Sequence, residues 1–363
     1  MTERIADYAA LAGRLGVDAV AIVPGPNFTR MTGRSFHTSE RPLVILIPPT
    51  GEPSAIVPNL ELRSFDFVEF EGPVFDWRDQ DGYAGAFAAL AAHMPLRRIA
   101  VEGQVMRVFV HHALMAAYPG LEIADAEAEI SGLRLRKTDD EIAALERAIA
   151  ISETALAELL AGLRPGLTEK EVGGRLTQLL FHHGAEDLSF HPIVAAAENS
   201  ARPHASARAD YALKAGDALL LDFGARWGGF AADITRTVFL GHASAEQEGV
   251  YATVLAANGA GHAATRAGVT AHDVDDAVIS VLEASPYADR IRTKTGHGLG
   301  RDVHEAPYIM RGNHQVLEAG MVFTDEPGLY DVAKFGVRIE DVLLVTETGC
   351  RSLTGFPRDL TVI

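Results

Sequence analysis

Four carboxylates and one histidine have the residue types and spacing of a metal centre. Each acid interrupts an apolar, strand-like run, where an unpaired charge would be costly to bury. Two divalent cations would balance four carboxylates, so this set predicts a hydrolytic dimetal centre. The residues are Asp222, Asp233, His297, Glu326 and Glu340, within LLLDFGARWGGFAADITRT, TGHGLGRDVHEAP, FTDEPGLY and GVRIED.

Two acid-bearing hairpins would bring the carboxylates together in pairs. A hairpin folded symmetrically about Trp227 and Gly228, within GARWGG, places Asp222 opposite Asp233. A second hairpin, centred in GLYDVAKFG, would set Glu326 against Glu340. Directly opposed like charges destabilise a bare sheet, and a cation between them reverses that penalty. Any one acid could equally cap a strand end in solvent, but the four together favour a site.

The histidines differ in how much their surroundings indicate. The chain has 14 of them, so a histidine alone means little. His297 is flanked by glycines in TGHGLG, which lets the backbone approach a ligand closely. His304 follows in the same motif, and His204 stands in the loop-like stretch ENSARPHASARAD. For His204 an exposed loop position is as consistent with the sequence as a catalytic one.

Composition restricts the class of protein. A chain of 363 residues fits two domains, and 48% hydrophobic with 22% charged residues is typical of soluble globular proteins. The formal net charge of −17 disfavours nucleic acid and anionic membranes as partners. The single Cys350 cannot form an intramolecular disulfide, and the N-terminus lacks a signal-peptide apolar core. These features predict a soluble cytoplasmic protein.

The pattern of elements changes along the chain. Strands over 18–23, 42–48, 54–58 and 98–103 alternate with helices over 3–15, 82–93 and 105–117, with a turn at PGPN, so the first part is an α/β domain. A long helix with acids at its start then opens a segment of helices grouped against antiparallel strands. The sequence predicts an α+β protein with domains at 1–131 and 132–363.

These motifs resemble a known family. LDFG, DITRT, GHGLGRDVHEAP, DEPGLY and GVRIED resemble the metallopeptidases of the pita-bread fold, the group of methionine aminopeptidase, aminopeptidase P and prolidase. DAVAIVPGPNFTRMTG and the paired strands after it resemble the N-terminal domain of prolidases, aminopeptidases P and creatinase. The resemblance implies a C-terminal pita-bread catalytic domain. It also implies a smaller α/β domain of the creatinase/prolidase type, which serves dimerisation or substrate gating in a homodimer.

The resemblance also implies a role for each predicted ligand. Asp222 would bind one metal, Asp233 and Glu340 would bridge both, and His297 and Glu326 would complete the coordination shell of the second metal. An oxygen-rich set with one histidine favours Mn²⁺, with Co²⁺, Fe²⁺ and Zn²⁺ as alternatives. Glu326 would be the general base.

Further residues would contact the substrate or support the ligands. By resemblance, His304 would stabilise the developing oxyanion and His204 would hold the substrate. Arg338 would orient the carboxylates, and Phe190 would pack near the substrate's proline.

The chain departs from the family pattern at two places. Ala197 stands near where a glycine is common, before the loop that leads to His204. Tyr308 stands where some prolidases carry an arginine, which would bind a substrate carboxylate bidentately. If the chain prefers dipeptides, Arg41 or Arg311 could supply that charge, although each could equally be a solvated surface arginine.

The sequence is therefore compatible with three functions. A prolidase would cleave Xaa-Pro dipeptides. An aminopeptidase P would release the residue before proline from longer peptides. A non-catalytic pita-bread protein would use the fold for binding alone, although the complete ligand set argues against it.

Overall fold

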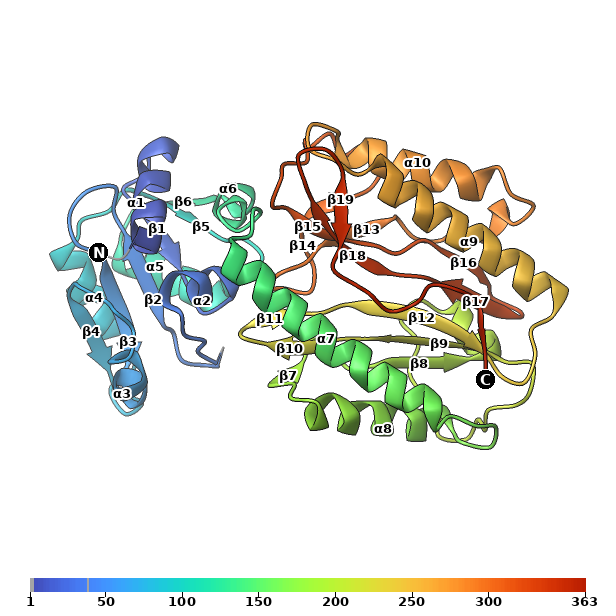
Figure 1. The fold of residues 1–363 in the computed structure, drawn as a ribbon. Coiled ribbons are helices and arrows are strands. Elements are labelled where there is room, and N and C mark those ends of the chain that lie inside the picture. Colours follow the sequence, from blue (N-terminus) through green and yellow to red (C-terminus); the bar gives the residue numbers. More distant parts are fainter. Residues whose placement is uncertain (1–2, 38) are drawn as a thin grey trace. The chain divides into compact units, whose positions relative to one another are not determined.

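The computed structural model describes residues 3–37 and 39–363. The chain divides into two compact units, Met1–Arg134 and Leu135–Ile363 (Figure 1). Among the described residues no helix has the length and apolar character needed to cross a bilayer.

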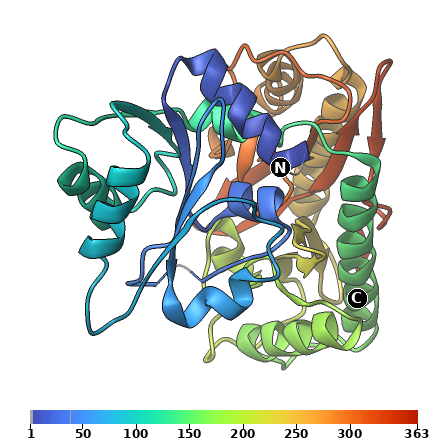
Figure 2. The ribbon, with the colours of Figure 1, turned by 90° about the vertical axis from the view of Figure 1, so that its left-hand side faces the viewer.

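The first unit is a six-stranded sheet with helices on both faces (Figure 2). Its strands are β1 (Ala19–Ile22), β2 (Val44–Ile47), β3 (Ser54–Pro58), β4 (Val74–Trp77), β5 (Arg98–Val101) and β6 (Glu122–Asp125), in the order β4-β3-β2-β1-β5-β6. Its helices are α1 (Glu3–Leu15), α2 (Pro26–Thr32), α3 (Leu62–Phe65), α4 (Ala84–His93), α5 (Val108–Ala117) and α6 (Glu127–Gly132).

Alternate side chains of β1 are apolar and point to opposite faces of the sheet, so helices pack against both faces. Val20 and Ile22 belong to the core that includes α1 and α2, whereas Ala19 and Ala21 belong to the core that includes α4 and α5. The turn predicted over PGPN is limited to a bend at Pro24 and Gly25, because Pro26 begins α2. Proline suits the first turn of a helix, where its missing N–H would have no partner.

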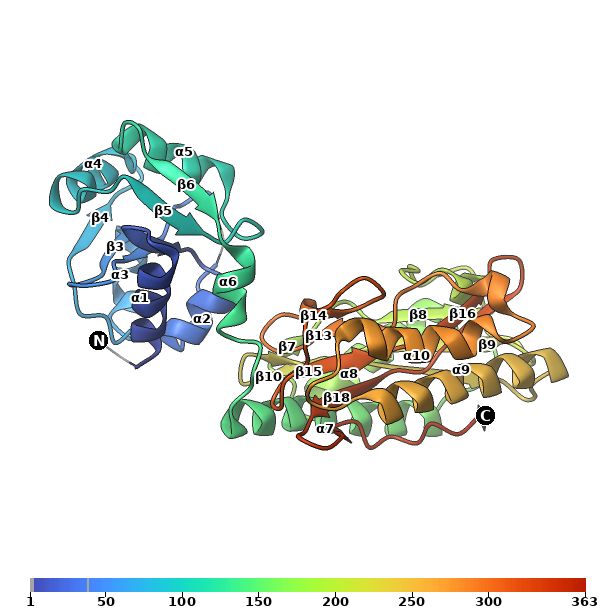
Figure 3. The same ribbon diagram turned by 90° about the horizontal axis from the view of Figure 1, so that it is seen from above.

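The second unit contains strands between two helical layers. In Figure 1, α7 (Asp139–Ala161) and α8 (Glu169–His182) lie on one side, and α9 (Ala245–Ala264) and α10 (Ala271–Glu283) on the other. Figure 3 shows α9 and α10 running side by side. Each of the four helices begins with a capping box, in which a Ser or Thr side chain and an acid or Gln three residues on exchange hydrogen bonds with the backbone.

Two larger sheets and two smaller ones form the middle of this unit. The larger sheets have the orders β20-β12-β9-β8 and β14-β13-β15-β18-β19. Their strands are β8 (Ile193–Ala196), β9 (Ala218–Phe223), β12 (Ile234–Phe239), β20 (Thr361–Val362), β13 (Gly296–Gly298), β14 (Glu305–Ile309), β15 (Val322–Asp325), β18 (Asp341–Val345) and β19 (Cys350–Ser352). The smaller sheets contain β7 (Asp187–Leu188), β10 (Ala225–Trp227) and β11 (Phe230–Ala231), and β16 (Gly328–Asp331) with β17 (Phe335–Arg338).

The first acid-bearing hairpin forms, but with a different register from the predicted one. Its turn is Gly228–Gly229, with φ of 58° and 77°. Left-handed backbone at both turn positions favours glycine, so the centre lies between these two residues. Asp222 therefore pairs with Thr235, and the predicted pairing of Asp222 with Asp233 was wrong. Asp233 lies in the break between β11 and β12.

The second acid-bearing hairpin has the register that the sequence predicted. Strand β15 pairs with β18 so that Asp325 lies opposite Asp341. The neighbouring ladder of β16 and β17 continues the same register. Glu326 and Glu340 lie between the two ladders, so the hairpin brings these two acids together.

Candidate dimetal active site

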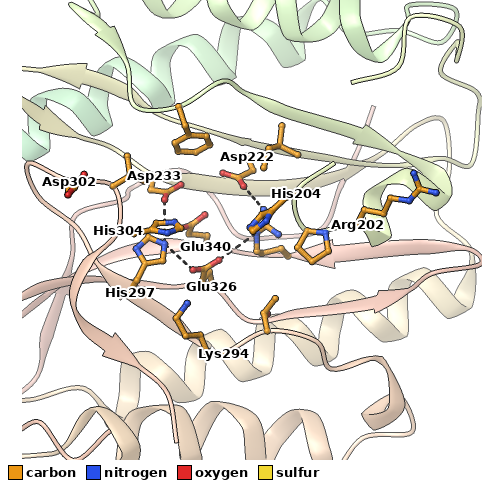
Figure 4. A pocket seen from close by; sticks show the side chains of 16 residues that line it. Arg202, His204, Asp222, Asp233, Lys294, His297, Asp302, His304, Glu326 and Glu340 are labelled. Carbon is orange, nitrogen blue, oxygen red and sulfur yellow. Dashed lines mark hydrogen bonds and ion pairs between the residues drawn. The ribbon is translucent and has the colours of Figure 1, made fainter. Parts of the chain in front are cut away.

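One cavity of about 1080 Å³ in the second unit brings the predicted site residues together (Figure 4). All five predicted ligands line it, as do His204, His304, Phe190 and Arg338. Tyr308 and Arg311 do not belong to its lining, and Arg41 belongs to the other unit. The lining residues are Phe190, Ile193, Arg202, Pro203, His204, Asp222, Asp233, Thr293, Lys294, His297, Asp302, Val303, His304, Glu326, Arg338 and Glu340.

The predicted ligands form two overlapping groups with the spacing of metal ligands. In one group, oxygens of Asp222, Asp233 and Glu340 lie within 4.8 Å of one another, and in the other, ligand atoms of His297, Glu326 and Glu340 do so. Glu340 belongs to both groups. His297 Nε2 lies 3.3 Å from Glu326 Oε1 and 3.7 Å from Asp233 Oδ2, which links Asp233 to the second group. Two ions could therefore share Asp233 and Glu340.

Close strand packing sets the positions of His297 and Glu326. The backbone N–H of His297 donates to Thr324 Oγ1 at 3.1 Å, and that of Glu326 donates to the Thr295 carbonyl at 2.7 Å. A Cβ on Gly296 would lie 1.8 Å from the Thr324 carbonyl oxygen. The glycine next to His297 therefore lets the two strands that carry these ligands approach each other.

Arg338 connects the carboxylates from behind. It is 3% exposed, and its guanidinium donates to Asp222 Oδ2, to Thr235 Oγ1 at 3.0 Å and to Tyr330 Oη at 3.0 Å. Thr235 Oγ1 in turn donates to Glu340 Oε2 at 2.6 Å. The guanidinium and the hydroxyl thus fix one oxygen on each of two predicted ligands.

The buried, closely spaced acids of the cluster form an electrostatic environment that favours bound cations. Burial, followed by the charges of neighbouring acids, raises the pKa of Asp233 and Glu340 well above its ordinary range. Burial also raises the pKa of Asp222, although the charge of Arg338 opposes that rise. Asp222 Oδ1 and Glu340 Oε1 are buried without a hydrogen-bond partner among the described residues. Buried oxygens that lack a donor beside like charges are costly unless a cation binds them, so these residues fit two divalent ions.

Two further histidines face the cavity. The rings of His304 and His297 lie 3.9 Å apart between centroids, and His304 comes within ligand distance of Asp233 and His297. Burial, followed by the charge of His297, lowers the pKa of His304 to about 4. His304 is therefore a neutral imidazole at pH 7 that can donate one hydrogen bond. His204 is exposed on the cavity wall beside Pro203.

Several residues that line the cavity were not predicted from the sequence. Lys294 and Asp302 lie within or beside the motif that contains His297 and His304, so nearness in sequence was the one available signal for them. Ile193 and Val303 add apolar surface to that of Phe190, and nothing in their sequence context distinguishes them from ordinary core residues.

The two units and the buried acid cluster define the chain as a two-domain metallohydrolase. Residues 143–347 match the model of metallopeptidase family M24, and residues 4–136 match the creatinase/prolidase N-terminal domain. The chain belongs to metallopeptidase family M24, as the motifs indicated.

Relatives match along the whole length of the chain. A probable dipeptidase PepE of Mycobacterium tuberculosis is 32% identical, over 99% of this chain and 96% of that protein. The crystal structure of a prolidase from Thermococcus sibiricus superposes with a TM-score of 0.94 at 33% identity, covering 99% and 98% of the two chains. An X-Pro aminopeptidase from Thermotoga maritima superposes with a TM-score of 0.85 at 30% identity, covering 98% of each.

Proposed function

We propose that the chain is a dimetal-dependent Xaa-Pro dipeptidase. The observation that carries this proposal is the pair of overlapping ligand groups on one cavity, which share Glu340 and are linked through Asp233. The relatives support the choice of substrate, because several of them are named dipeptidase or prolidase.

Asp222, Asp233 and Glu340 would hold one ion, and His297 and Glu326 would complete the shell of the other. When bound, two such ions supply Lewis-acid chemistry, polarising a carbonyl and lowering the pKa of water. Glu326 is the predicted ligand most open to the cavity, with its side chain 18% exposed. Glu326 would take a proton from the attacking water and deliver it to the proline nitrogen that leaves.

The remaining lining residues would place the substrate for that proton transfer. His304, a neutral donor on the wall beside His297, would stabilise negative charge on the carbonyl oxygen. His204 would hold the substrate, and Phe190 would pack on the proline ring together with Ile193. Arg338 would keep the acids aligned through its three hydrogen bonds.

Aminopeptidase P activity is the second candidate. The similarity to the X-Pro aminopeptidase of Thermotoga maritima supports it. The two activities need the same acids and the same proton transfer. They differ in whether the site accepts a substrate with further residues after the proline.

A comparison of three substrates tests the proposal. Metal-loaded protein should hydrolyse Ala-Pro, hydrolyse Ala-Pro-Ala more slowly, and leave Ala-Ala largely intact. A chelator should abolish the activity and Mn²⁺ should restore it. Full activity in rigorously metal-free protein would contradict the dimetal site. Faster cleavage of the tripeptide would favour aminopeptidase P, and no cleavage of any peptide would favour a binding function.

Finer parts of the proposal rest on the sequence. The oxygen-rich ligand set favours Mn²⁺ over Co²⁺, Fe²⁺ and Zn²⁺. Resemblance to the family suggests a homodimer in which the N-terminal unit serves dimerisation or substrate gating. The single cysteine is consistent with a cytoplasmic location. Metal analysis of the purified protein and sedimentation velocity would test the first two of these.

A further inference from the structure

Three side chains with a fixed positive charge line the cavity, and they differ in what they contact. Arg338 is buried and bound to Asp222. Arg202 is exposed, and its guanidinium points away from the acid cluster (Figure 4). Lys294 is partly buried, and its ammonium points toward the predicted ligands (Figure 4). Lys294 is therefore the cation best placed to meet a bound substrate.

The Lys294 ammonium has no carboxylate partner among the described residues. Its Nζ lies 5.9 Å from the centroid of the Tyr308 ring, and its charge acts on Glu326 although the structure shows no direct ion pair between these two side chains. By contrast, Arg311 is held by Asp276 at 2.9 Å and by Glu283 at 2.7 Å. Because no carboxylate among the described residues forms a direct ion pair with it, the Lys294 ammonium is available to a ligand that enters the cavity.

The backbone beside Lys294 is fixed relative to the acid cluster. The N–H of Thr295 donates to Asp275 Oδ1 at 2.8 Å, and the Thr295 carbonyl accepts the N–H of Glu326 at 2.7 Å. The two peptide groups that flank Thr295 thus fix the residue after Lys294 relative to Asp275 and to the predicted general base. The position of the lysine is set by the same contacts that set the base, while its four-carbon stem lets the ammonium adjust.

Charge balance indicates what kind of ligand the lysine meets. In the metal-loaded site, the four positive charges of two divalent ions would match the four ligand carboxylates. Arg202, Lys294 and Arg338 would then outnumber Asp302, the remaining acid of the lining, so the lining would carry a net positive charge. The loaded cavity therefore favours an anionic group on the side of Lys294.

Resting on the proposed peptidase function, we propose that Lys294 binds the free carboxylate of an Xaa-Pro dipeptide and so selects dipeptides over longer peptides. In a dipeptide, the carboxylate is attached to the Cα next to the proline nitrogen, so it lies close to the scissile bond. In a longer peptide, a neutral amide replaces that carboxylate. An ammonium beside the predicted base is therefore placed to distinguish the two.

A matched pair of substrates tests this role, namely Ala-Pro and its uncharged C-terminal amide. With Mn²⁺-loaded full-length protein, Lys294→Met should raise the KM for Ala-Pro by roughly 10–100-fold, the range for loss of a hydrogen bond to a charged group. The KM for the amide should change less than about threefold. Lys294→Arg, which keeps the charge, should retain most of the discrimination.

A control variant separates recognition from a general charge effect. Lys170 is exposed on α8 and does not line the cavity. Lys170→Met makes the same change of charge, and it should leave both KM values unaltered. Product inhibition gives a second readout. Proline should inhibit wild type more strongly than prolinamide does, and Lys294→Met should remove that difference.

The outcomes distinguish this inference from the proposed function. Equal losses on both substrates, or wild type that cleaves the amide as readily as the dipeptide, would overturn the role of Lys294 while leaving Xaa-Pro hydrolysis intact. If wild type cleaves neither substrate, the proposed function itself fails, and this inference with it. If Lys294→Met does not fold, Lys294→Gln, which removes the charge but keeps a polar side chain, provides the same test, and unchanged discrimination in that variant would overturn the role.

Discussion

At the scale of single residues, the site depends on acids that are costly without a cation. Asp233 and Glu340 are almost fully buried, and burial together with neighbouring acids raises the pKa of each well above its ordinary range. Glu326 differs from them. Burial opposes its ionisation, but contact with His297 and the charges of Arg338 and Lys294 lower its pKa. Glu326 is therefore the acid of the cluster that is ionised most easily, and the ionised form is the one that can accept a proton.

Two variants should separate the role of a ligand from that of an oxyanion donor. Glu326→Gln should lower both metal content and turnover, because it removes a ligand and the base. His304→Ala should keep the metal content and reduce kcat roughly 10²–10³-fold, as expected for loss of one donor. Elemental analysis alongside steady-state kinetics would measure both effects. Equal metal loss in the two variants would mean that His304 is itself a ligand. The test is informative because His304 lies close enough to Asp233 and His297 to share an ion with them.

Behind the ligands, one buried acid should reduce stability. Asp325 is 0% exposed, its carboxylate oxygens lack a hydrogen-bond partner among the described residues, and it lies opposite Asp341. Asp325→Asn should therefore raise the stability of the metal-free protein by on the order of 1 kcal/mol. Asp341→Asn should have the opposite effect and cost about 3 kcal/mol, because it weakens a buried 2.8 Å ion pair with Arg236. Denaturant unfolding would measure both, and a loss of stability in Asp325→Asn would contradict the expectation.

At the scale of elements, a single buried acid anchors the segment that carries His204. Glu169, at the start of α8, is fully buried. It accepts the N–H of Ala196 at 2.8 Å and the Asn199 amide at 3.0 Å. It also accepts the N–H of Arg208 at 2.7 Å. Because these contacts lie on both sides of His204, the capped helix α8 fixes both ends of the loop.

Within that loop, the backbone of Ala197 is strained. Its φ is +49°, a left-handed conformation that costs a residue with a Cβ about 1–2 kcal/mol. Ala197→Gly should therefore stabilise the protein by about 1 kcal/mol, after the greater chain entropy of glycine is deducted. For a unit of this size the gain corresponds to a rise in Tm of roughly 2–4 °C. Ala195→Gly, in the buried strand β8, is the matched control and should lower the Tm.

In the first unit, an acid connects β1 to β5. Asp18 Oδ2 accepts the backbone N–H groups of Arg97 at 2.6 Å and Arg98 at 2.9 Å, and these bonds lower the pKa of Asp18. A lowered folded-state pKa means that the carboxylate contributes stability above its unfolded pKa near 4, and that this contribution is lost as the pH falls through the folded value. Asp18→Asn should thus lower the Tm at pH 7. The difference from wild type should shrink toward pH 3, and a constant difference across that range would contradict the assignment.

At the scale of the whole molecule, metal binding should couple to stability. Any ligand that binds only the folded state stabilises it, by about 2.7 kcal/mol at a hundred times its Kd. Chelation should therefore lower the Tm, because the clustered acids are left repelling one another. Asp233→Asn should raise the Tm of the metal-free protein and reduce the shift produced by Mn²⁺. Calorimetry with and without Mn²⁺ would measure both changes in Tm. A Mn²⁺-induced rise in Tm that is the same in the variant as in wild type would exclude Asp233 as a shared ligand.

The sequence by itself determined the family, the two-domain plan and the chemistry of the site. These features depend on residue type and local order. A charged residue within an apolar run is costly to bury unless it is paired, whichever part of the protein the run packs against. A capping box is a local signal that marks the start of a helix. The register of the second hairpin was also predictable, since Glu326 and Glu340 are symmetric about its turn.

Only the tertiary structure decided which residues accompany the ligands. The first hairpin shifted from its predicted register because left-handed backbone falls on Gly228–Gly229, and this placed Thr235 opposite Asp222. The sequence likewise does not show whether Arg311 or Lys294 is the cation available to a substrate carboxylate. Arg311 is held by acids of α10, whereas Lys294 lines the cavity without a carboxylate partner among the described residues. Whether a charge is available to a substrate depends on what packs beside it, and that is set by elements distant along the chain.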